Sequence, residues 1–512
     1  MTVEAFVVRI GRSLLPLLAG ILAFASFPKI DLGYLAWIST ALLAIFISNC
    51  RTARAAFCGG LFAGIIERGA LLVWIPAVMS TYGGLPRFAA WGAFVPLIVM
   101  LALFPAAACV ATRFLMNQLG ERFLFAFPVI WVAMEYALCF VPFGGFPWLL
   151  SGYSQTKYLP LIQIADLTGI YGVSFLLLWF NTSLAWVYLK GRRGNWPLTL
   201  ALVLISASLV YGRAEIRHWD RVEADRRVVM IQGNLSADEE WQTLRWKSQE
   251  GYARLAARLS PADADLLILP EAPSPVSFER DGEYREGMRR LASRFGLGLI
   301  FNNVAIEDGG GESRYFNSAY FMNPAGEVVA RYDKIHLVPF GEYIPLRRYF
   351  GFLQTITKDV GGFDPGSSYR AAELGGQPVN AIICFEAVFP QIERDFARRG
   401  SGLVVNLTND RWYGTSAAPY QHLLMSRWRA IENRRFLLRA TNSGISAIID
   451  PLGRVRAQTA LLTEGVCLGR FAFVQESSFY ARHGDWLAIL CAMITVVLLG
   501  FAVFAVRLFR RK

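Results

Sequence analysis

The stretch of sequence that decides the fold of this chain is Ala381-Ile382-Ile383-Cys384-Phe385-Glu386. An apolar run typical of a buried strand ends there on a thiol and a carboxylate. A second apolar run, Leu266-Leu267-Ile268-Leu269-Pro270-Glu271, ends on a carboxylate, and a third stretch at 331–342 carries a lysine. Proteins of the α/β class place their chemistry at strand ends. We therefore expect Glu271, Lys334 and Cys384 to form one site.

The sequence around these stretches alternates short β-rich runs with helical runs. The expected strands are 228–235, 266–269, 297–306, 379–383 and 403–407. The expected helices are 245–259, 284–295, 390–399 and 420–436. This alternation predicts an α/β fold in which helices cover layered sheets. Because a fold alone says little about chemistry, the site residues must carry the functional argument.

The rest of the chain is too apolar for an ordinary soluble protein. Of the 512 residues, 54% are hydrophobic, and the mean hydropathy is +0.37. The apolar residues are concentrated on both sides of a mixed, globular stretch. We therefore expect a multi-span α-helical membrane bundle plus an α/β extramembrane domain. The expected parts are a membrane region of about seven transmembrane helices (1–212), the α/β domain (213–482), and a final transmembrane helix with a basic tail (483–512).

Eight apolar blocks approach the roughly 20 residues that a helix needs to cross a bilayer. They lie near 12–28, 32–49, 56–80, 88–112, 123–142, 160–189, 196–212 and 485–506. Basic residues cluster in alternate short loops, which marks these loops as cytoplasmic: Arg9 and Arg12, Arg51 and Arg54, Arg113 and Arg122, and Lys190, Arg192 and Arg193. Seven spans from a cytoplasmic start place the 213–482 domain on the periplasmic side.

Two features of the membrane region leave alternatives open. The first apolar block is either a retained helix or a signal peptide, because Arg12 precedes an apolar core that ends in Ala23-Phe24-Ala25. Glu67, Arg68 and Glu135 lie within apolar blocks, where charge is costly. These three residues are either satisfied inside the bundle or at its interface, or they take part in substrate binding.

Composition argues against several other classes of function. The net charge of +12 does not indicate nucleic-acid binding, since much of the Lys and Arg flanks the apolar blocks. The seven cysteines are scattered, without a CxxC pair or a histidine cluster nearby. We therefore expect neither a disulfide framework nor a zinc site. No phosphate-binding loop appears, and we expect no cofactor.

Glu271, Lys334 and Cys384 together suit chemistry at an acyl carbonyl. A carboxylate near a thiol can act as a general base, and the resulting thiolate can attack the carbonyl carbon. A lysine ammonium, helped by a backbone N–H beside Cys384, would stabilise the oxyanion. Each residue alone has an ordinary explanation, because a cysteine after an apolar strand is usually packing and a lone Glu or Lys is usually surface charge. Only the ordered set points to catalysis.

The ordered set resembles the nitrilase superfamily, whose members use Glu, Lys and Cys on an αββα sandwich. The motifs within residues 225–472 are Pro270-Glu271-Ala272, Tyr332-Asp333-Lys334, Pro339-Phe340-Gly341-Glu342 and Cys384-Phe385-Glu386. With the membrane spans, the whole chain resembles the apolipoprotein N-acyltransferase family. That resemblance implies acyl transfer in the bacterial inner membrane, from a phospholipid through a Cys384 thioester to the α-amino group of a lipoprotein diacylglyceryl-cysteine.

The resemblance also implies roles for individual residues. By its place in the motifs, Glu271 resembles the general base of the family, Lys334 resembles the residue that stabilises the oxyanion, and Cys384 resembles the nucleophile. Further matches are Glu342 and Glu386, at supporting acidic positions, and Trp241, at a functional tryptophan for which ordinary core packing is an equal alternative. Phe385 stands where the family usually has tyrosine, so the side chain at this position has no hydroxyl group to contribute.

Two other functions fit parts of the sequence. The first is a membrane-tethered nitrilase or amidase that hydrolyses a small C–N substrate with the same triad. The second is a non-catalytic transporter whose sandwich serves as a binding module. The spans show no clear internal repeat of the kind that transporters use, which argues against the second.

Overall fold

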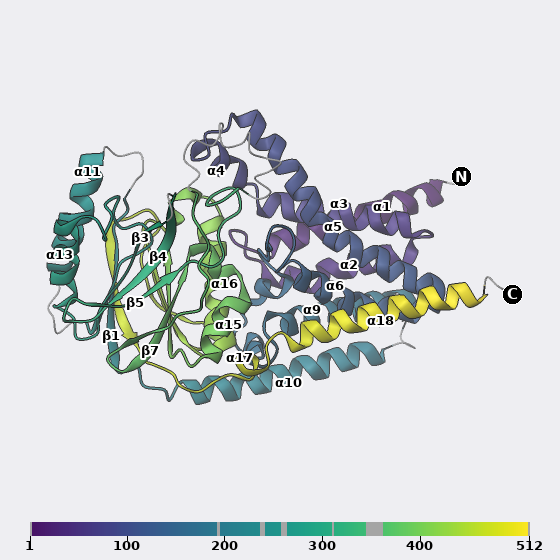
Figure 1. The fold of residues 1–512 in the computed structure, drawn as a ribbon. Coiled ribbons are helices and arrows are strands. Elements are labelled where there is room, and N and C mark those ends of the chain that lie inside the picture. The colour runs from purple at the N-terminus through teal and green to yellow at the C-terminus, as the bar shows by residue number, and fades with distance from the viewer. Residues whose placement is uncertain are drawn as a thin grey trace. The chain divides into compact units, whose positions relative to one another are not determined.

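Two compact units make up the chain (Figure 1). The computed structural model describes residues 3–191, 195–235, 241–257, 264–309, 312–344 and 362–509. The first unit comprises Met1–Ser80, Pro86–Glu215 and Asp485–Lys512. The second comprises Thr81–Leu85 and Ile216–Gly484. The first is helical and the second is α/β, as the change in hydropathy along the sequence predicts.

Helices form the first unit. Nearly continuous apolar sequence lets these helices bury one face against neighbours and turn the other to lipid. Within the unit, α3 packs against α5, and α1 packs against α2 and α3. In chain order the elements are α1 (Val3–Ala25), η1 (Gly33–Leu35), α2 (Ala36–Asn49), α3 (Ala53–Leu71), α4 (Ile75–Thr81), α5 (Arg87–Leu119), η2 (Glu121–Phe125), α6 (Ala126–Ala137), η3 (Ser151–Gln155), α7 (Leu159–Ile162), α8 (Ala165–Thr168), α9 (Ile170–Lys190), α10 (Trp196–Trp219) and α18 (Trp486–Phe509).

Four helices in the described part of the chain are long and apolar enough to cross a membrane, namely α5, α9, α10 and α18. The pair α3 and α4, bent by 49° at a short break, can form a fifth span. The block expected as one span at 160–189 is divided into α7, α8 and α9, and the backbone turns between α8 and α9 at Gly169, with φ +63°. The block at 123–142 begins with the end of η2, and the α-helix that follows, α6, has 12 residues. The count of eight spans stays a prediction.

The charged residues of the apolar blocks have partners inside the first unit. Arg68 Nη1 donates to the carbonyl oxygen of Trp148 at 2.9 Å. Glu135 Oε1 accepts from the backbone N–H of Ser151 at 2.8 Å. Glu67 Oε1 lies 4.0 Å from Arg68 Nη2. Buried charges are tolerated where such partners exist. The contacts agree with the alternative in which the bundle itself satisfies these residues.

Two six-stranded sheets form the second unit. One has the order β12 (Gly465–Phe471), β1 (Arg226–Gln232), β2 (Leu266–Ile268), β3 (Gly298–Gly309), β4 (Glu312–Met322) and β5 (Val328–Asp333). The other has the order β11 (Val455–Gln458), β10 (Ala447–Ile449), β9 (Phe436–Thr441), β8 (Leu403–Thr408), β7 (Gln377–Ile383) and β6 (Ala372–Leu374). Strands β1 to β3 are parallel to one another, and so are β7 to β9. Parallel strands are covered on both faces, which explains their continuous apolar sequence.

Helices cover the outer face of each sheet, giving four layers (Figure 1). Helices α12 and α13 contact β1 and β3, whereas α15 and α16 contact β7 and β9. The two sheets meet where β1 contacts β9 and β4 contacts β7. The expected αββα sandwich is therefore confirmed. Its helices are α11 (Trp241–Trp246), η5 (Lys247–Gly251), α12 (Tyr252–Ala257), α13 (Gly282–Ala292), η7 (Cys384–Val388), α15 (Pro390–Arg398), η8 (Asp410–Tyr413), α16 (Ala418–Asn433) and α17 (Phe479–His483).

Candidate active site

Three reactive side chains follow the ends of three strands in the second unit. Glu271 comes shortly after β2, and Lys334 and Cys384 come directly after β5 and β7. Because β7 belongs to the other sheet, the two sheets together bring these residues into one place. Lys334 Nζ lies 3.9 Å from Glu271 Oε1, and the Cys384 thiol is close enough to influence the pKa of both groups. The structure thus brings the three expected residues together.

Cys384 has an unusual backbone conformation. It opens the short helix η7 with φ +50°, in the left-handed region, where a residue other than glycine is strained by about 1–2 kcal/mol. The side chain is 6% exposed. Burial and the Glu271 carboxylate raise the pKa of the thiol, although Lys334 lowers it. A thiol held in this way stays protonated at neutral pH and needs a base to become a nucleophile.

Lys334 is held as a buried cation. Its side chain is 1% exposed, and Nζ donates to Glu342 Oε1 at 2.8 Å. Burial lowers the pKa of the ammonium, but the carboxylates of Glu342 and Glu271 outweigh burial and raise it. Lys334 therefore remains charged at neutral pH. A fixed positive charge in a buried site can stabilise negative charge that develops nearby.

Glu271 presents one unengaged oxygen. Its Oε1 accepts from Asn317 Nδ2 at 2.9 Å, whereas Oε2 has no hydrogen-bond partner within the described ranges of the chain. Burial raises the pKa of this carboxyl above its ordinary value of 4.5, and Glu342 adds to the effect, while Lys334 opposes it. A raised pKa brings a carboxylate closer to the strength of a useful general base.

Two asparagines that we did not predict connect the acidic residues. Asn317 Nδ2, from β4, donates to Glu271 Oε1 and to Glu342 Oε1, both at 2.9 Å. Its Oδ1 accepts from Asn302 Nδ2 at 2.6 Å, and Asn302 Oδ1 accepts from the backbone N–H of Ala272 at 3.0 Å. Asparagine is depleted in strands. Its presence at buried positions of β3 and β4 was the available signal.

Glu386 ties the two halves of the site together. Its Oε2 accepts from the backbone N–H of Ile383 at 2.7 Å, at the end of β7. Its Oε1 accepts from Tyr332 Oη and from the backbone N–H of Ile335, both at 2.8 Å, in the segment around Lys334. The side chain is fully buried. Charge-assisted hydrogen bonds of this kind are stronger than neutral ones, so Glu386 holds the lysine segment against the cysteine segment.

Two family models match the chain. Residues 19–183 match the apolipoprotein N-acyltransferase N-terminal domain, and residues 227–476 match carbon-nitrogen hydrolase. The apolipoprotein N-acyltransferase of Geobacter metallireducens is 37% identical over 508 residues, which cover 98% of this chain and 95% of that protein. The chain belongs to the apolipoprotein N-acyltransferase family.

Other relatives of the same name give similar matches. The protein of Methylococcus capsulatus is 33% identical, and the match covers 94% of this chain and 94% of that protein. The protein of Chlorobaculum tepidum is 30% identical, and the match covers 94% of this chain and 95% of that protein. A solved structure, Nit3 of Saccharomyces cerevisiae, a member of branch 10 of the nitrilase superfamily, shares 18% identity over 48% of this chain and 89% of that chain, with a TM-score of 0.37. The curated relatives confirm the resemblance to apolipoprotein N-acyltransferases, and the chain is an acyltransferase.

This apolipoprotein N-acyltransferase family member carries Phe385 directly after Cys384. The Phe385 ring is buried, and its centroid lies 5.1 Å from that of Phe389 in an edge-to-face contact and 6.1 Å from that of His336. Packing thus holds the ring in place without a hydroxyl group. Trp241 begins α11, but its side chain lies outside the described residues, so its functional role stays a prediction.

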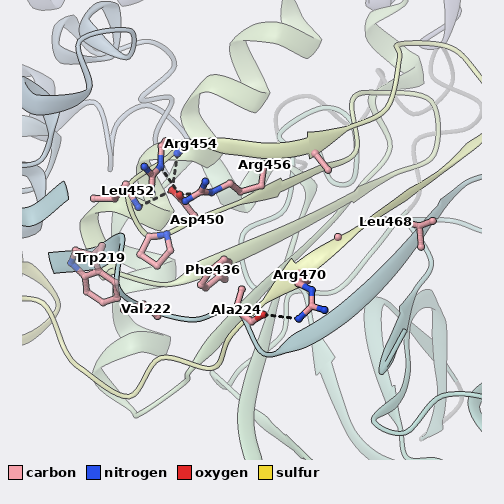
Figure 2. A pocket seen from close by; sticks show the side chains of 13 residues that line it. Trp219, Val222, Ala224, Phe436, Asp450, Leu452, Arg454, Arg456, Leu468 and Arg470 are labelled. Carbon is pink, nitrogen blue, oxygen red and sulfur yellow. Dashed lines mark hydrogen bonds and ion pairs between the residues drawn. The ribbon is translucent and has the colours of Figure 1, made fainter. Parts of the chain in front are cut away.

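A cavity of about 290 Å³ lies elsewhere in the second unit of this family member (Figure 2). Figure 2 shows Arg454 and Arg456 converging on Asp450, to which they donate at 2.7 and 2.8 Å. The residues that line this cavity do not include Glu271, Lys334 or Cys384. Because two of its cations are paired with the buried Asp450, the cavity offers no comparable chemistry, and the triad remains the candidate active site.

Proposed function

We propose that this acyltransferase moves a fatty acyl chain from a phospholipid to the α-amino group of the diacylglyceryl-cysteine at a lipoprotein N-terminus. One observation carries the proposal: Glu271, Lys334 and Cys384 converge in a buried site of a chain that belongs to the apolipoprotein N-acyltransferase family. The names of the relatives indicate the acceptor class, and the triad supports nucleophilic acyl transfer.

In the first half-reaction, Cys384 takes the acyl group. Glu271 Oε2 accepts the thiol proton, and the sulfur attacks the ester carbonyl carbon of the phospholipid, forming a C–S bond. The Lys334 ammonium and the backbone N–H of Phe385 stabilise the oxyanion. When the intermediate collapses, the ester C–O bond breaks. The lysophospholipid leaves as an alcohol that takes the proton from Glu271, and the acyl thioester remains on Cys384.

In the second half-reaction, the amine of the acceptor replaces sulfur. The neutral α-amino nitrogen attacks the thioester carbonyl, so that a C–N bond forms and the C–S bond breaks. Glu271 takes a proton from nitrogen and returns it to sulfur, which restores the starting enzyme. Because the phospholipid product leaves before the acceptor reacts, the kinetics are ping-pong.

The burial of the triad supports transfer over hydrolysis. Glu271 is 8% exposed, and Lys334 and Cys384 are more deeply buried. A thioester must survive until the amine arrives, and a site from which water is excluded protects such an intermediate. Glu342 and Glu386 support the site through Lys334 and through the strand ends, respectively.

We infer that the reaction takes place on the periplasmic side of the bacterial inner membrane. Basic residues in alternate loops of the N-terminal region support a cytoplasmic start. Both the phospholipid donor and the diacylated acceptor are lipids. A catalyst anchored in the same bilayer therefore meets them by diffusion in two dimensions.

Purified protein incubated with acyl-labelled phospholipid and a diacylated lipopeptide tests the proposal. We expect the label to appear as an amide on the peptide N-terminus, and Cys384→Ala to abolish this transfer. A membrane-tethered amidase for a small C–N substrate would instead leave the peptide unlabelled, and any acyl group that reached Cys384 would be released to water as fatty acid. We expect Glu271→Ala to eliminate acyl transfer. In a transporter-like binding protein, the same substitution would leave the function unaffected, because Glu271 would have no catalytic role.

A further inference from the structure

A histidine holds the peptide group that follows the nucleophile. His422, in α16, places Nε2 3.1 Å from the carbonyl oxygen of Cys384. If Nε2 carried a lone pair, it would face the lone pairs of that oxygen and repel them. The contact is therefore a hydrogen bond in the tautomer that carries the proton on Nε2, in which Nδ1 accepts from Arg439 Nη2. The left-handed backbone of Cys384 is thus held on one side by Glu386, through Ile383, and on the other by His422.

The imidazole of His422 is itself fixed by a buried ion pair. Its Nδ1 lies 2.9 Å from Asp410 Oδ1 and 3.1 Å from Arg439 Nη2. Arg439 Nη2 also donates to Asp410 Oδ2 at 2.7 Å. All three side chains are 0% exposed. A paired and fully desolvated network of this kind is rigid, because rotating the imidazole would leave a buried polar group without its partner.

The contact with Cys384 has a chemical consequence for the residue that follows. The carbonyl of Cys384 and the N–H of Phe385 belong to one peptide group. A hydrogen bond donated to the carbonyl polarises the amide and makes its N–H a stronger donor, which is the cooperative effect known from hydrogen-bond chains. In the proposed reaction, this N–H faces the oxyanion.

We propose that His422, held by Asp410 and Arg439, is a positioning residue that strengthens oxyanion stabilisation through the Cys384–Phe385 peptide group. It acts on the transition state through the backbone, by its hydrogen bond to the carbonyl oxygen of Cys384. The inference takes one element from the proposed function, namely that Cys384 becomes acylated. It predicts that His422 matters for attack on a carbonyl and not for reactions of the thiolate that form no oxyanion.

Two reactions of Cys384 in the full-length protein separate these effects. Acylation by p-nitrophenyl octanoate passes through an oxyanion, and its rate is read from the initial burst of p-nitrophenol. Alkylation by iodoacetamide is a displacement at saturated carbon without an oxyanion. Its rate is read by mass spectrometry of the peptide that contains Cys384. Both reactions need the thiolate, so their ratio isolates the oxyanion contribution.

The variants are His422→Leu, which removes the donor, and His422→Gln, whose amide N–H can replace it. Tyr420→Phe is the matched control, because Tyr420 lies two residues before His422 in α16 and is 39% exposed. We expect His422→Leu to slow acylation about 10-fold while alkylation stays within about twofold of the unmodified protein. His422→Gln should recover most of the loss, and Tyr420→Phe should change neither rate.

Equal losses in both reactions would show that His422 only maintains the fold, and an unchanged acylation rate would show that it contributes nothing. Either result overturns the inference, as does a wild-type protein that the ester fails to acylate. The ester bypasses both lipid substrates. A selective effect of His422 with the ester, in a protein that fails to transfer acyl chains from phospholipid, would support the inference while contradicting the proposed function.

Discussion

Lys334 Nζ lies 2.8 Å from Glu342 Oε1, which makes Glu342 the nearest anionic partner of the lysine in the described part of the chain. Glu271 Oε1 is more distant, at 3.9 Å. Glu342 can therefore balance the charge of the ammonium and orient it, while Glu271 keeps an oxygen available for the thiol proton. The two carboxylates share the donor Asn317 and yet have separate tasks.

Glu342→Gln should slow acylation of Cys384 by about 10-fold to 100-fold, because the amide keeps an oxygen for Lys334 but removes the charge that orients the ammonium. The rate is measured as the appearance of acylated protein after mixing with phospholipid. Glu327→Gln, at an exposed turn before β5, is the matched control and should retain the full rate. An unimpaired Glu342→Gln variant would contradict this division of tasks.

The acylation rate should fall on acidification at a pH above 4.5. Glu271 must be ionised to accept the thiol proton, and burial raises the pKa of its carboxyl above that ordinary value. As pH falls through the raised pKa, the carboxylate is protonated and the base is lost. A pH profile of the p-nitrophenol burst checks this. A rate that holds constant down to pH 4.5, or rises on acidification, would argue against Glu271 as the base.

Phe385→Tyr should change acyl transfer by less than about threefold, because the ring is held by packing against Phe389 and His336. Cys384→Ala should eliminate transfer, since no other group replaces the thiolate. Both variants are compared in the lipopeptide assay. A large gain in the Phe385→Tyr variant would mean that a hydroxyl at this position contributes to the mechanism.

Reporters placed after residues 215 and 512 of a cysteine-free variant should lie on opposite sides of the membrane. Alternate-loop charge predicts that residue 215 is periplasmic and that the basic C-terminal tail is cytoplasmic. Accessibility to a reagent that does not cross the bilayer distinguishes the two sides. Both reporters on one side would disprove the expected number of spans.

Much of the sandwich could be predicted because its parallel strands are buried on both faces. The expected strands at 266–269, 379–383 and 403–407 coincide closely with β2, β7 and β8. The helix expected at 420–436 was too long, because Arg434 adopts a left-handed conformation, with φ +54°, and ends α16 at Asn433. Strand β9 then begins at Phe436. Arginine is not a usual helix terminator, so the sequence contains no local signal for this boundary.

The reactive residues could be predicted, but their partners could not. Glu271, Lys334 and Cys384 each follow a strand, and position along a strand is a local property of sequence. Asn317 and His422 act through contacts with residues 46 and 38 positions away. The sheet order and the packing of α16 create these contacts, and neither is encoded in a short motif.

Mass spectrometry of the protein incubated with phospholipid alone tests the central claim most directly. The account predicts one acyl group on the peptide that contains Cys384, accumulating without any acceptor and released by neutral hydroxylamine, as expected of a thioester. Glu271→Gln should prevent the adduct, because the buried thiol would stay protonated. If acyl transfer to lipopeptide proceeds normally while no adduct forms on Cys384, the amine attacks the phospholipid directly and the proposed mechanism is wrong.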